Sequence, residues 1–126
     1  MGRYAAGVLS SGLECTVGPM DYSVSGVALV FSGGVYDALS TVIAARSADS
    51  NCEISALVDA VQNVFCLLVE RPFHHGLKAS VEGFGSDLSI PESPGASMNP
   101  GAVRWTSAVP LIVNGLEGEL TLYIWR

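Results

Sequence analysis

Charged residues are scarce in this sequence. They make up 14% of the chain, against about 25% in an ordinary globular domain, whereas hydrophobic residues make up 49%. Because so few charged side chains cannot coat a lone domain of this size, we expect apolar surface to remain exposed. Such surface usually marks a contact with another protein. The composition therefore favours a homo-oligomer or an assembly subunit, for example a structural or virion component, over a free monomer.

Basic residues are the scarcer of the two charge types. Six Lys and Arg stand against twelve Asp and Glu, so the formal net charge is −6. A chain of that charge lacks the clustered Lys and Arg side chains that bind the phosphates of a nucleic acid, so we expect no nucleic-acid partner. The acidity suits a basic protein partner, and it also maintains solubility, which is the commoner reason for such a charge. A small acidic inhibitor or immunity-type protein that blocks such a partner is the alternative function.

Long uninterrupted apolar runs are absent. The first four residues are not followed by the apolar stretch of a signal peptide, and the most apolar window, 24–45, contains Asp37 and a Ser-Gly-Gly segment. A membrane span tolerates such residues poorly. We therefore expect a soluble protein of the cytoplasm or of a virion, with no signal peptide, no transmembrane segment and no membrane partner.

Cysteine and histidine are few and are poorly spaced for metal binding. Cys15, Cys52 and Cys66 form no C-x-x-C pair, so we expect reduced and mostly buried thiols. His74 and His75 are adjacent, and neighbouring side chains on an extended segment point in opposite directions. We therefore expect no metal site and no cofactor, with both histidines on a surface loop.

Catalytic residues cannot be assigned from the spacing. The one conceivable nucleophilic set would join a cysteine to a histidine and to an acid such as Asp59 or Asp87, and nothing in the spacing favours it. The prediction leans towards a protein without enzymatic activity.

A short segment, 33–39, resembles the glycine-led helix of hotdog-fold thioesterases. The resemblance implies a small oligomeric enzyme in which an acid on that helix does the chemistry. This is the second alternative function. The likeness is confined to that segment, and the helix predicted after it does not fit that fold.

The clearest helix signal lies over residues 50–70. Ser50 and Glu53 fit a capping box, in which each side chain satisfies a free backbone N–H, and a proline at 72 ends the segment. Further apolar residues towards the C-terminal end predict burial there on more than one side. A second, shorter helix is expected over 36–46. The apolar positions of the long helix form one stripe: Ile54, Leu57, Val58, Val61, Phe65 and Leu68.

Several segments have the patterns of strands. Residues 13–17 alternate weakly and precede a turn at Gly18 and Pro19. Residues 24–31 form an apolar run whose length and β-branched content favour a buried strand. Residues 77–84 alternate loosely, and residues 87–90 extend that strand or form another short one.

The strongest strand signal lies over residues 104–126. Asn114 and Gly115 are the signature of a two-residue type I′ turn between two alternating runs. The turn sets a register in which Arg104 faces Trp125, and this register makes one face of the hairpin almost wholly apolar. Pro110 has no N–H, which favours an edge position for its strand.

Together these elements predict a single α+β domain over residues 1–126. We expect an antiparallel sheet of about four to five strands, packed on one long amphipathic helix over 50–70, with one shorter helix beside it. The hairpin over 104–126 belongs to that sheet.

The candidate binding residues come from two places. One is the loop over 91–101, which is long and rich in Pro, Gly and Ser, as contact loops often are. The other is the outer face of the last strand, which carries aromatic and acidic side chains. The partner expected there is a protein or a second copy of the chain. The predicted binding residues are Tyr123, Trp125, Glu117, Glu119, Pro94 and Met98.

Overall fold

The chain folds into three helices and six strands in a computed structural model that describes residues 2–85, 87–98 and 103–126. The fold is α+β, as the sequence predicts. The helices are α1 (Gly2–Glu14), α2 (Val35–Ala48) and α3 (Ser55–Leu68). The strands are β1 (Thr16–Val24), β2 (Val27–Gly34), β3 (His74–Val81), β4 (Leu88–Pro91), β5 (Val103–Val113) and β6 (Leu116–Trp125).

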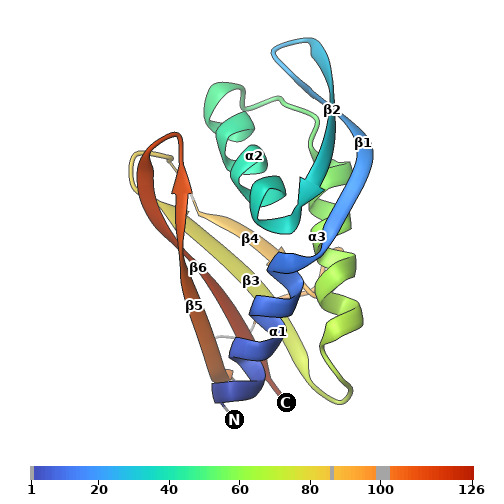
Figure 1. Cartoon of the computed structure of the whole chain (residues 1–126), viewed down its shortest axis with the longest axis vertical. Helices are drawn as coiled ribbons and strands as arrows, with labels where there is room; N and C mark the ends of the chain where they lie inside the picture. Colours follow the sequence, from blue (N-terminus) through green and yellow to red (C-terminus); the bar gives the residue numbers. More distant parts are fainter. Residues whose placement is uncertain (1, 86, 99–102) are drawn as a thin grey trace.

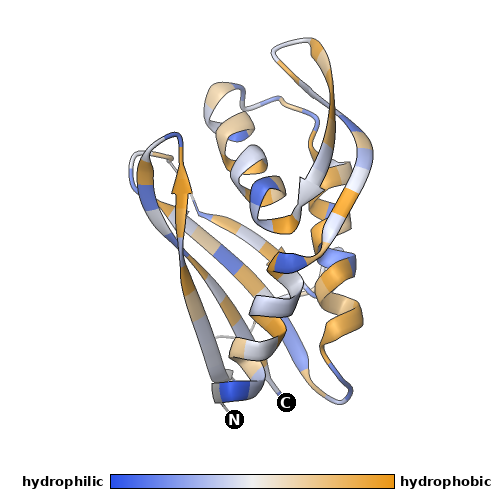
Figure 2. Cartoon of the chain, viewed as in Figure 1, coloured by the Kyte–Doolittle hydropathy of each residue, from blue (hydrophilic) through white to orange (hydrophobic). Residues whose placement is uncertain are grey.

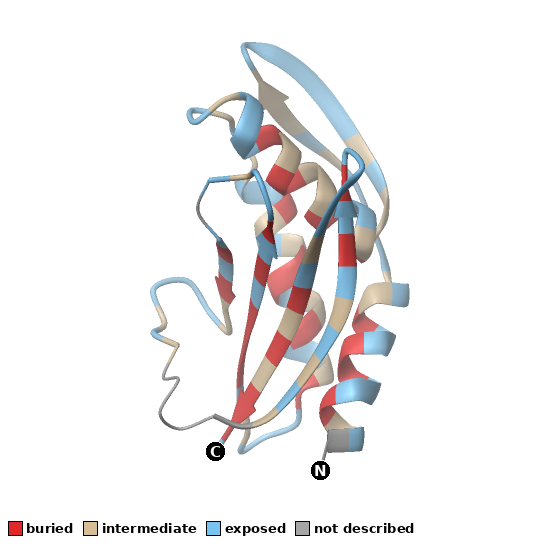
Figure 3. Cartoon of the chain, turned by 90° about the vertical axis from the view of Figure 1, so that its left-hand side faces the viewer, coloured by how far each residue is buried: buried red, intermediate tan, exposed pale blue. Residues whose placement is uncertain are grey.

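The strands form two separate antiparallel sheets. One has the order β4-β3-β6-β5, and the other contains only β1 and β2. The three helices lie on one face of the larger sheet, and no described helix covers its other face (Figures 1 and 3). The prediction of a single sheet packed on one long helix is therefore wrong. All three helices pack on the larger sheet, and β1 and β2 form a separate two-stranded hairpin.

Helix α3 begins later than predicted because Glu53, two residues before its start, pairs with β1. The N–H of Glu53 donates to the carbonyl of Ser23 (2.9 Å), and the N–H of Ser23 donates to the carbonyl of Glu53 (3.0 Å). The Glu53 carboxylate accepts hydrogen bonds from the hydroxyl and the N–H of Ser55, and these bonds lower the pKa of that carboxyl. The predicted capping box between Ser50 and Glu53 does not form.

The apolar stripe of α3 is confirmed at its centre. Leu57, Val61 and Phe65 are fully buried. Cys66 is exposed and Leu67 is 87% exposed, so the prediction that the C-terminal half is buried on more than one side is wrong. Only one face of the helix packs on the rest of the molecule, and these two residues lie on the other.

Helix α1 occupies a segment rich in Gly and Ser for which no helix is predicted. Ala5, Val8 and Leu9 are buried at helical spacing, and Gly12 continues their stripe against Phe65. Glycine and serine have low helix propensity, so packing on the core stabilises this helix more than its own sequence does. The strand predicted over 13–17 is therefore mostly helix and linker, and β1 starts at Thr16.

The apolar run over 24–31 divides into two strands. Ser25 and Gly26 have positive φ angles of 52° and 77° and form the two-residue turn between β1 and β2. The prediction of one buried strand is wrong, because the first four residues of β2 are exposed. Gly18 and Pro19, predicted as a turn, lie inside β1 at an irregularity in its pairing.

The C-terminal hairpin is confirmed from its turn to the pair of Trp105 with Ile124. Asn114 and Gly115 have positive φ angles of 51° and 80°, as a type I′ turn requires. Strand β5 is an edge strand, as Pro110 predicts. The side chains on the apolar face are buried against the helices: Leu111, Val113, Leu120, Leu122 and Ile124.

The register of this hairpin departs from the prediction at its open end. A shift between Val103 and Trp105 places Val103, not Arg104, opposite Trp125. Trp125 lies on the outer face of the sheet, as predicted, but it is only 7% exposed.

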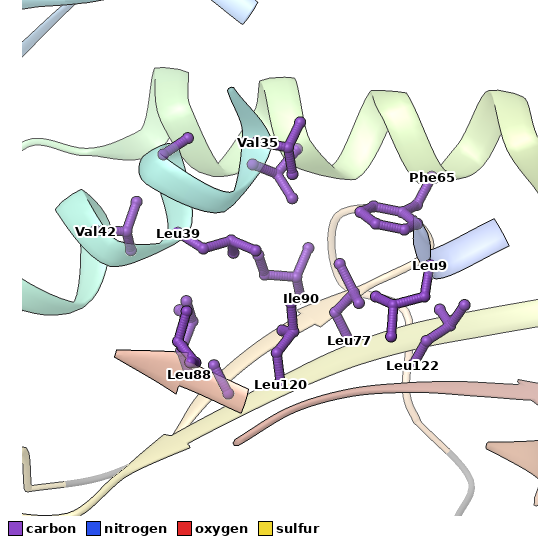
Figure 4. Packing of buried hydrophobic residues seen from close by; sticks show 14 of the residues in the cluster. Leu9, Val35, Leu39, Val42, Phe65, Leu77, Leu88, Ile90, Leu120 and Leu122 are labelled. Carbon is purple, nitrogen blue, oxygen red and sulfur yellow. The ribbon is translucent and has the colours of Figure 1, made fainter. Parts of the chain in front are cut away.

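The remaining elements agree with their predicted positions. Helix α2 covers the predicted 36–46 helix, β3 covers most of 77–84, and β4 is the separate short strand near 87–90. No described helix is both long and apolar enough to cross a membrane. Between the helices and the larger sheet lies the core, where side chains of all three helices meet those of the sheet (Figure 4). The residues labelled there are Leu9, Val35, Leu39, Val42, Phe65, Leu77, Leu88, Ile90, Leu120 and Leu122.

Candidate protein-interaction surface

Strand β2 carries a run of exposed apolar side chains. Val27 is 56% exposed, Leu29 39% and Val30 66%, and Ala28 between them is also exposed. Figure 2 shows this apolar stretch on a hairpin that extends beyond the helices, and Figure 3 shows the same stretch open to solvent. We call residues 27–30 the apolar edge of β2.

The hairpin that carries this edge is anchored at its root. Met20 and Phe31 are cross-strand partners, so they share a face, and both pack against the core together with Tyr22. At the other end, the N–H of Ser25 in the turn donates to Oδ2 of Asp49 (2.8 Å). The hairpin is therefore held at both ends, and β2 is presented in one orientation.

The backbone of β2 offers unpaired hydrogen-bonding groups on its outer side. Ser23 of β1 directs its N–H and carbonyl outward to Glu53, so its partner Ala28 directs its own groups away from β1. Val30, two residues further, does the same. No described residue donates to or accepts from these outward groups of Ala28 and Val30.

Each of the other sheet edges is engaged at least in part by another segment. On β5, the N–H of Ile112 donates to the hydroxyl of Tyr36 (3.0 Å), which donates to the carbonyl of Pro110 (3.5 Å), and α1 packs along the same strand. Strand β4 is short, and Nε2 of the buried Gln62 donates to the carbonyl of Pro91 (2.9 Å). The outer edge of β1 is the one that pairs with the segment before α3. Within the described residues, β2 is therefore the edge on which no outward backbone group is bonded to another segment.

Three of the predicted binding residues gather at one end of the uncovered sheet face. Trp125 is paired with His74, with ring centroids 6.1 Å apart, and Tyr123 is paired with Gly76. Met98 lies so close over Gly76 that a β-carbon there would be 2.8 Å from its Cε. Met98 and Tyr123 are half-buried and Trp125 is nearly buried. Little of this cluster is free to meet a partner.

The other three predicted binding residues lie elsewhere. Glu117 and Glu119 are exposed near the turn of the C-terminal hairpin, opposite Ile112 and Pro110. Pro94 is exposed in the loop after β4. The last part of the predicted contact loop, residues 99–101, lies outside the described residues. The structure therefore does not bring the six residues into one site.

The two histidines begin β3 and consequently lie on opposite faces of the sheet. His74 is exposed, with Nδ1 2.8 Å from Oε1 of Glu92. His75 is 4% exposed, and neither of its ring nitrogens has a hydrogen-bond partner among the described residues. Burial lowers the pKa of His75, an effect that the nearby Glu92 carboxylate opposes. The prediction of a surface pair is wrong for His75.

The cysteines are free thiols in different surroundings. Cys15 and Cys52 are half-buried, but Cys66 is exposed, which corrects the expectation of mostly buried thiols. Burial, followed by the charge of Asp49, raises the pKa of the Cys52 thiol. Among the described residues, no three His, Cys, Asp or Glu side chains come close enough together to hold a metal ion.

A cavity of about 340 Å³ opens between the end of α2 and the β3–β4 hairpin. Its volume is at the lower end of the range for small-molecule sites. Arg46 is the charged residue among the described residues that line it, and none of these carries a carboxylate or an imidazole for acid–base chemistry. Asp37, the acid in the segment that resembles a hotdog helix, is exposed in the first turn of α2 and does not line this cavity.

Comparison of the chain with protein-family models, with curated proteins and with solved structures found no match. Function is therefore inferred from geometry and chemistry alone. The Ser25-Gly26 dipeptide, a common turn signal, is the one sequence feature that locates the β1–β2 hairpin. No sequence signal reveals that β2 is exposed, because an apolar run ordinarily indicates burial.

Proposed function

We propose that this chain is a non-enzymatic interaction or assembly subunit that accepts a strand of another polypeptide along the apolar edge of β2. The observation that carries the proposal is the contrast between the sheet edges. On β1, β4 and β5 at least one outward backbone group is bonded to another described segment, whereas on β2 none is.

An added strand would find complementary groups on this edge. Ala28 and Val30 each present an outward N–H and an outward carbonyl. Each backbone hydrogen bond contributes a net stabilisation of about 0.5–1.5 kcal/mol. The apolar side chains on both faces of β2 add about 25 cal/mol for each Å² that they bury. Strand addition of this kind takes its affinity from the main chain and its specificity from alternate side chains.

The composition of β2 supports the same function. Proteins usually protect an exposed edge strand with charged side chains, proline, a bulge or a covering segment. Strand β2 contains no charged residue and no proline between Val27 and Gly34, and its irregular pairing lies only near its root. A strand without these protections is suited to pairing with a partner.

The proposal is tested with a short synthetic peptide that alternates Val and Thr and ends in lysines. Its basic ends suit the net charge of −6 of the chain. Backbone amide shifts and hydrogen exchange are measured by NMR at a dilution where the chain does not self-associate. We expect the amides of Ala28 and Val30 to become protected, and that of Leu29, which faces β1, to change little.

The matched variants are Ala28→Pro and Ile112→Lys. Proline at residue 28 removes an N–H that β1 does not use, so it blocks strand addition while sparing the hairpin. Ile112 is 54% exposed on the other sheet, so a lysine there changes the surface away from β2 and should leave the protection by the peptide intact. Peptide protection that ignores Ala28→Pro, or no protection on β2 at all, would contradict the proposal.

A further inference from the structure

The open edge of β2 is suited to pairing with itself, and this inference rests on the function proposed above. We propose that the strand added to β2 is the β2 strand of a second copy, running antiparallel and centred on Leu29. The two hairpins then form one four-stranded sheet, β1-β2-β2-β1, across a two-fold axis. Such an axis places the same surface of each copy against the other, as in most homodimers.

The backbone of β2 has the symmetry that this pairing requires. The outward groups belong to Ala28 and Val30, which lie at equal distances along the strand from Leu29. An antiparallel pair centred on Leu29 therefore places Ala28 of one copy opposite Val30 of the other. Each such pair exchanges two hydrogen bonds, so every outward N–H and carbonyl of these residues is satisfied.

The side chains are compatible with the same register. On one face, the small Ala28 meets the larger Val30 of the second copy, so neither face is overfilled. On the other face, Leu29 meets its own counterpart, and Val27 meets Phe31. All of these residues are apolar, and Val27, Leu29 and Val30 are between 39% and 66% exposed in the single chain. Pairing removes part of this surface from water.

Charge allows self-pairing although each copy carries a net charge of −6. No charged residue lies in β2. Of the acids of the hairpin region, Asp21 lies in β1, Glu53 lies beyond the outer edge of β1, and Asp49 at the end of α2 accepts from the N–H of Ser25 in the turn. In the four-stranded sheet the two β1 strands are about 14 Å apart, three spacings of about 4.8 Å. Repulsion over that distance is largely screened at physiological salt, where the Debye length is about 8 Å.

The size of the contact determines how the dimer should behave. Self-pairing covers residues 27–31 only, because β2 begins at Val27 and the register is centred on Leu29. A contact of that length is smaller than a standard interface of about 1,200–2,000 Å². The dimer is therefore reversible and depends on protein concentration, and added salt shifts the equilibrium towards it by screening the acidic surfaces.

The test is the mass of the full chain in solution, measured by sedimentation velocity and by light scattering over a wide range of concentration. We expect the wild-type mass to rise from 13.1 kDa towards twice that value. Val30→Lys places like charges across the axis, and Ala28→Pro removes a shared donor, so both variants stay at 13.1 kDa. Ile112→Lys carries the same new charge outside the contact and dimerises as the wild type does.

The outcomes separate this inference from the function on which it rests. A wild type that stays monomeric at every concentration overturns self-pairing. So does a dimer that Val30→Lys and Ala28→Pro leave intact while Ile112→Lys disrupts it. If the chain is monomeric but the Val/Thr peptide protects Ala28 and Val30, strand addition survives and the occupant is another protein. If neither occurs, both proposals are wrong. Circular dichroism of each variant confirms that it remains folded.

Discussion

Gly12 of α1 faces the ring of Phe65 in α3 so closely that a β-carbon on Gly12 would lie far inside van der Waals contact with Cε1 and Cζ of the ring. Phe65 is fully buried, so its ring has no free space into which to move. The approach of these two helices therefore depends on the absence of a side chain at residue 12.

Gly12→Ala should destabilise the protein, although alanine is the better helix former. The clash with Phe65 forces a shift in the packed core, which typically costs about 1–3 kcal/mol. Gly7→Ala in the same helix is the matched control, since a β-carbon there meets nothing within 4 Å. It should stabilise by about 0.5–1 kcal/mol. Urea denaturation measures both, and a Gly12→Ala variant as stable as Gly7→Ala would contradict this packing.

Truncating Leu57 should cost far more than truncating Leu67. Both residues are in α3, but Leu57 is fully buried and Leu67 is 87% exposed. Leu57→Ala leaves a cavity and is expected to lower the free energy of unfolding by about 2–5 kcal/mol. Leu67→Ala should change it by no more than about 0.5 kcal/mol. Equal losses in urea denaturation would mean that the helix is oriented differently.

Tyr36→Phe should expose the edge of β5. The substitution removes the hydroxyl that accepts from the N–H of Ile112 and donates to the carbonyl of Pro110. Each lost hydrogen bond costs about 0.5–1.5 kcal/mol, and the Ile112 amide should exchange faster with solvent. Tyr123→Phe is the control, because no hydrogen bond of the Tyr123 hydroxyl occurs among the described residues. Unchanged exchange at Ile112 in Tyr36→Phe would show that this edge is protected in another way.

Stability should fall as the pH drops below about 6.5, the ordinary pKa of histidine in an unfolded chain. Burial lowers the pKa of His75, so below pH 6.5 the unfolded state binds a proton that the folded state does not. The stability that depends on a neutral His75 is fully present above that pH and is lost as the pH falls towards the pKa of His75 in the folded state. The slope for one proton is at most about 1.4 kcal/mol per pH unit.

His75→Leu removes this proton and should flatten the profile between pH 5 and 7, a range set by the ordinary histidine pKa of about 6.5. Leucine also replaces a ring whose two nitrogens have no partner among the described residues, so the variant should be at least as stable as the wild type at low pH. His74→Gln keeps His75 and should retain the slope. Thermal unfolding at several pH values measures the slope of stability against pH. If this slope persists in His75→Leu, it arises from a group other than His75.

Local signals in the sequence were sufficient for some elements. Asn114 and Gly115 demand positive φ angles that only a tight turn supplies, so the C-terminal hairpin and most of its register follow from the chain itself. The stripe through Leu57, Val61 and Phe65 likewise determined a helix and its buried face. In both cases the information lies within about ten neighbouring residues, which is the range over which periodicity acts.

Contacts between distant segments decided the rest. Helix α1 has weak propensity and forms because Ala5, Val8 and Leu9 find a core to pack against. Glu53 is extended because Ser23, thirty residues earlier, pairs with it. The apolar run of β2 predicts burial by itself, but whether a strand is buried or open depends on which other segment lies beside it. Only the tertiary structure shows that no described segment covers that edge.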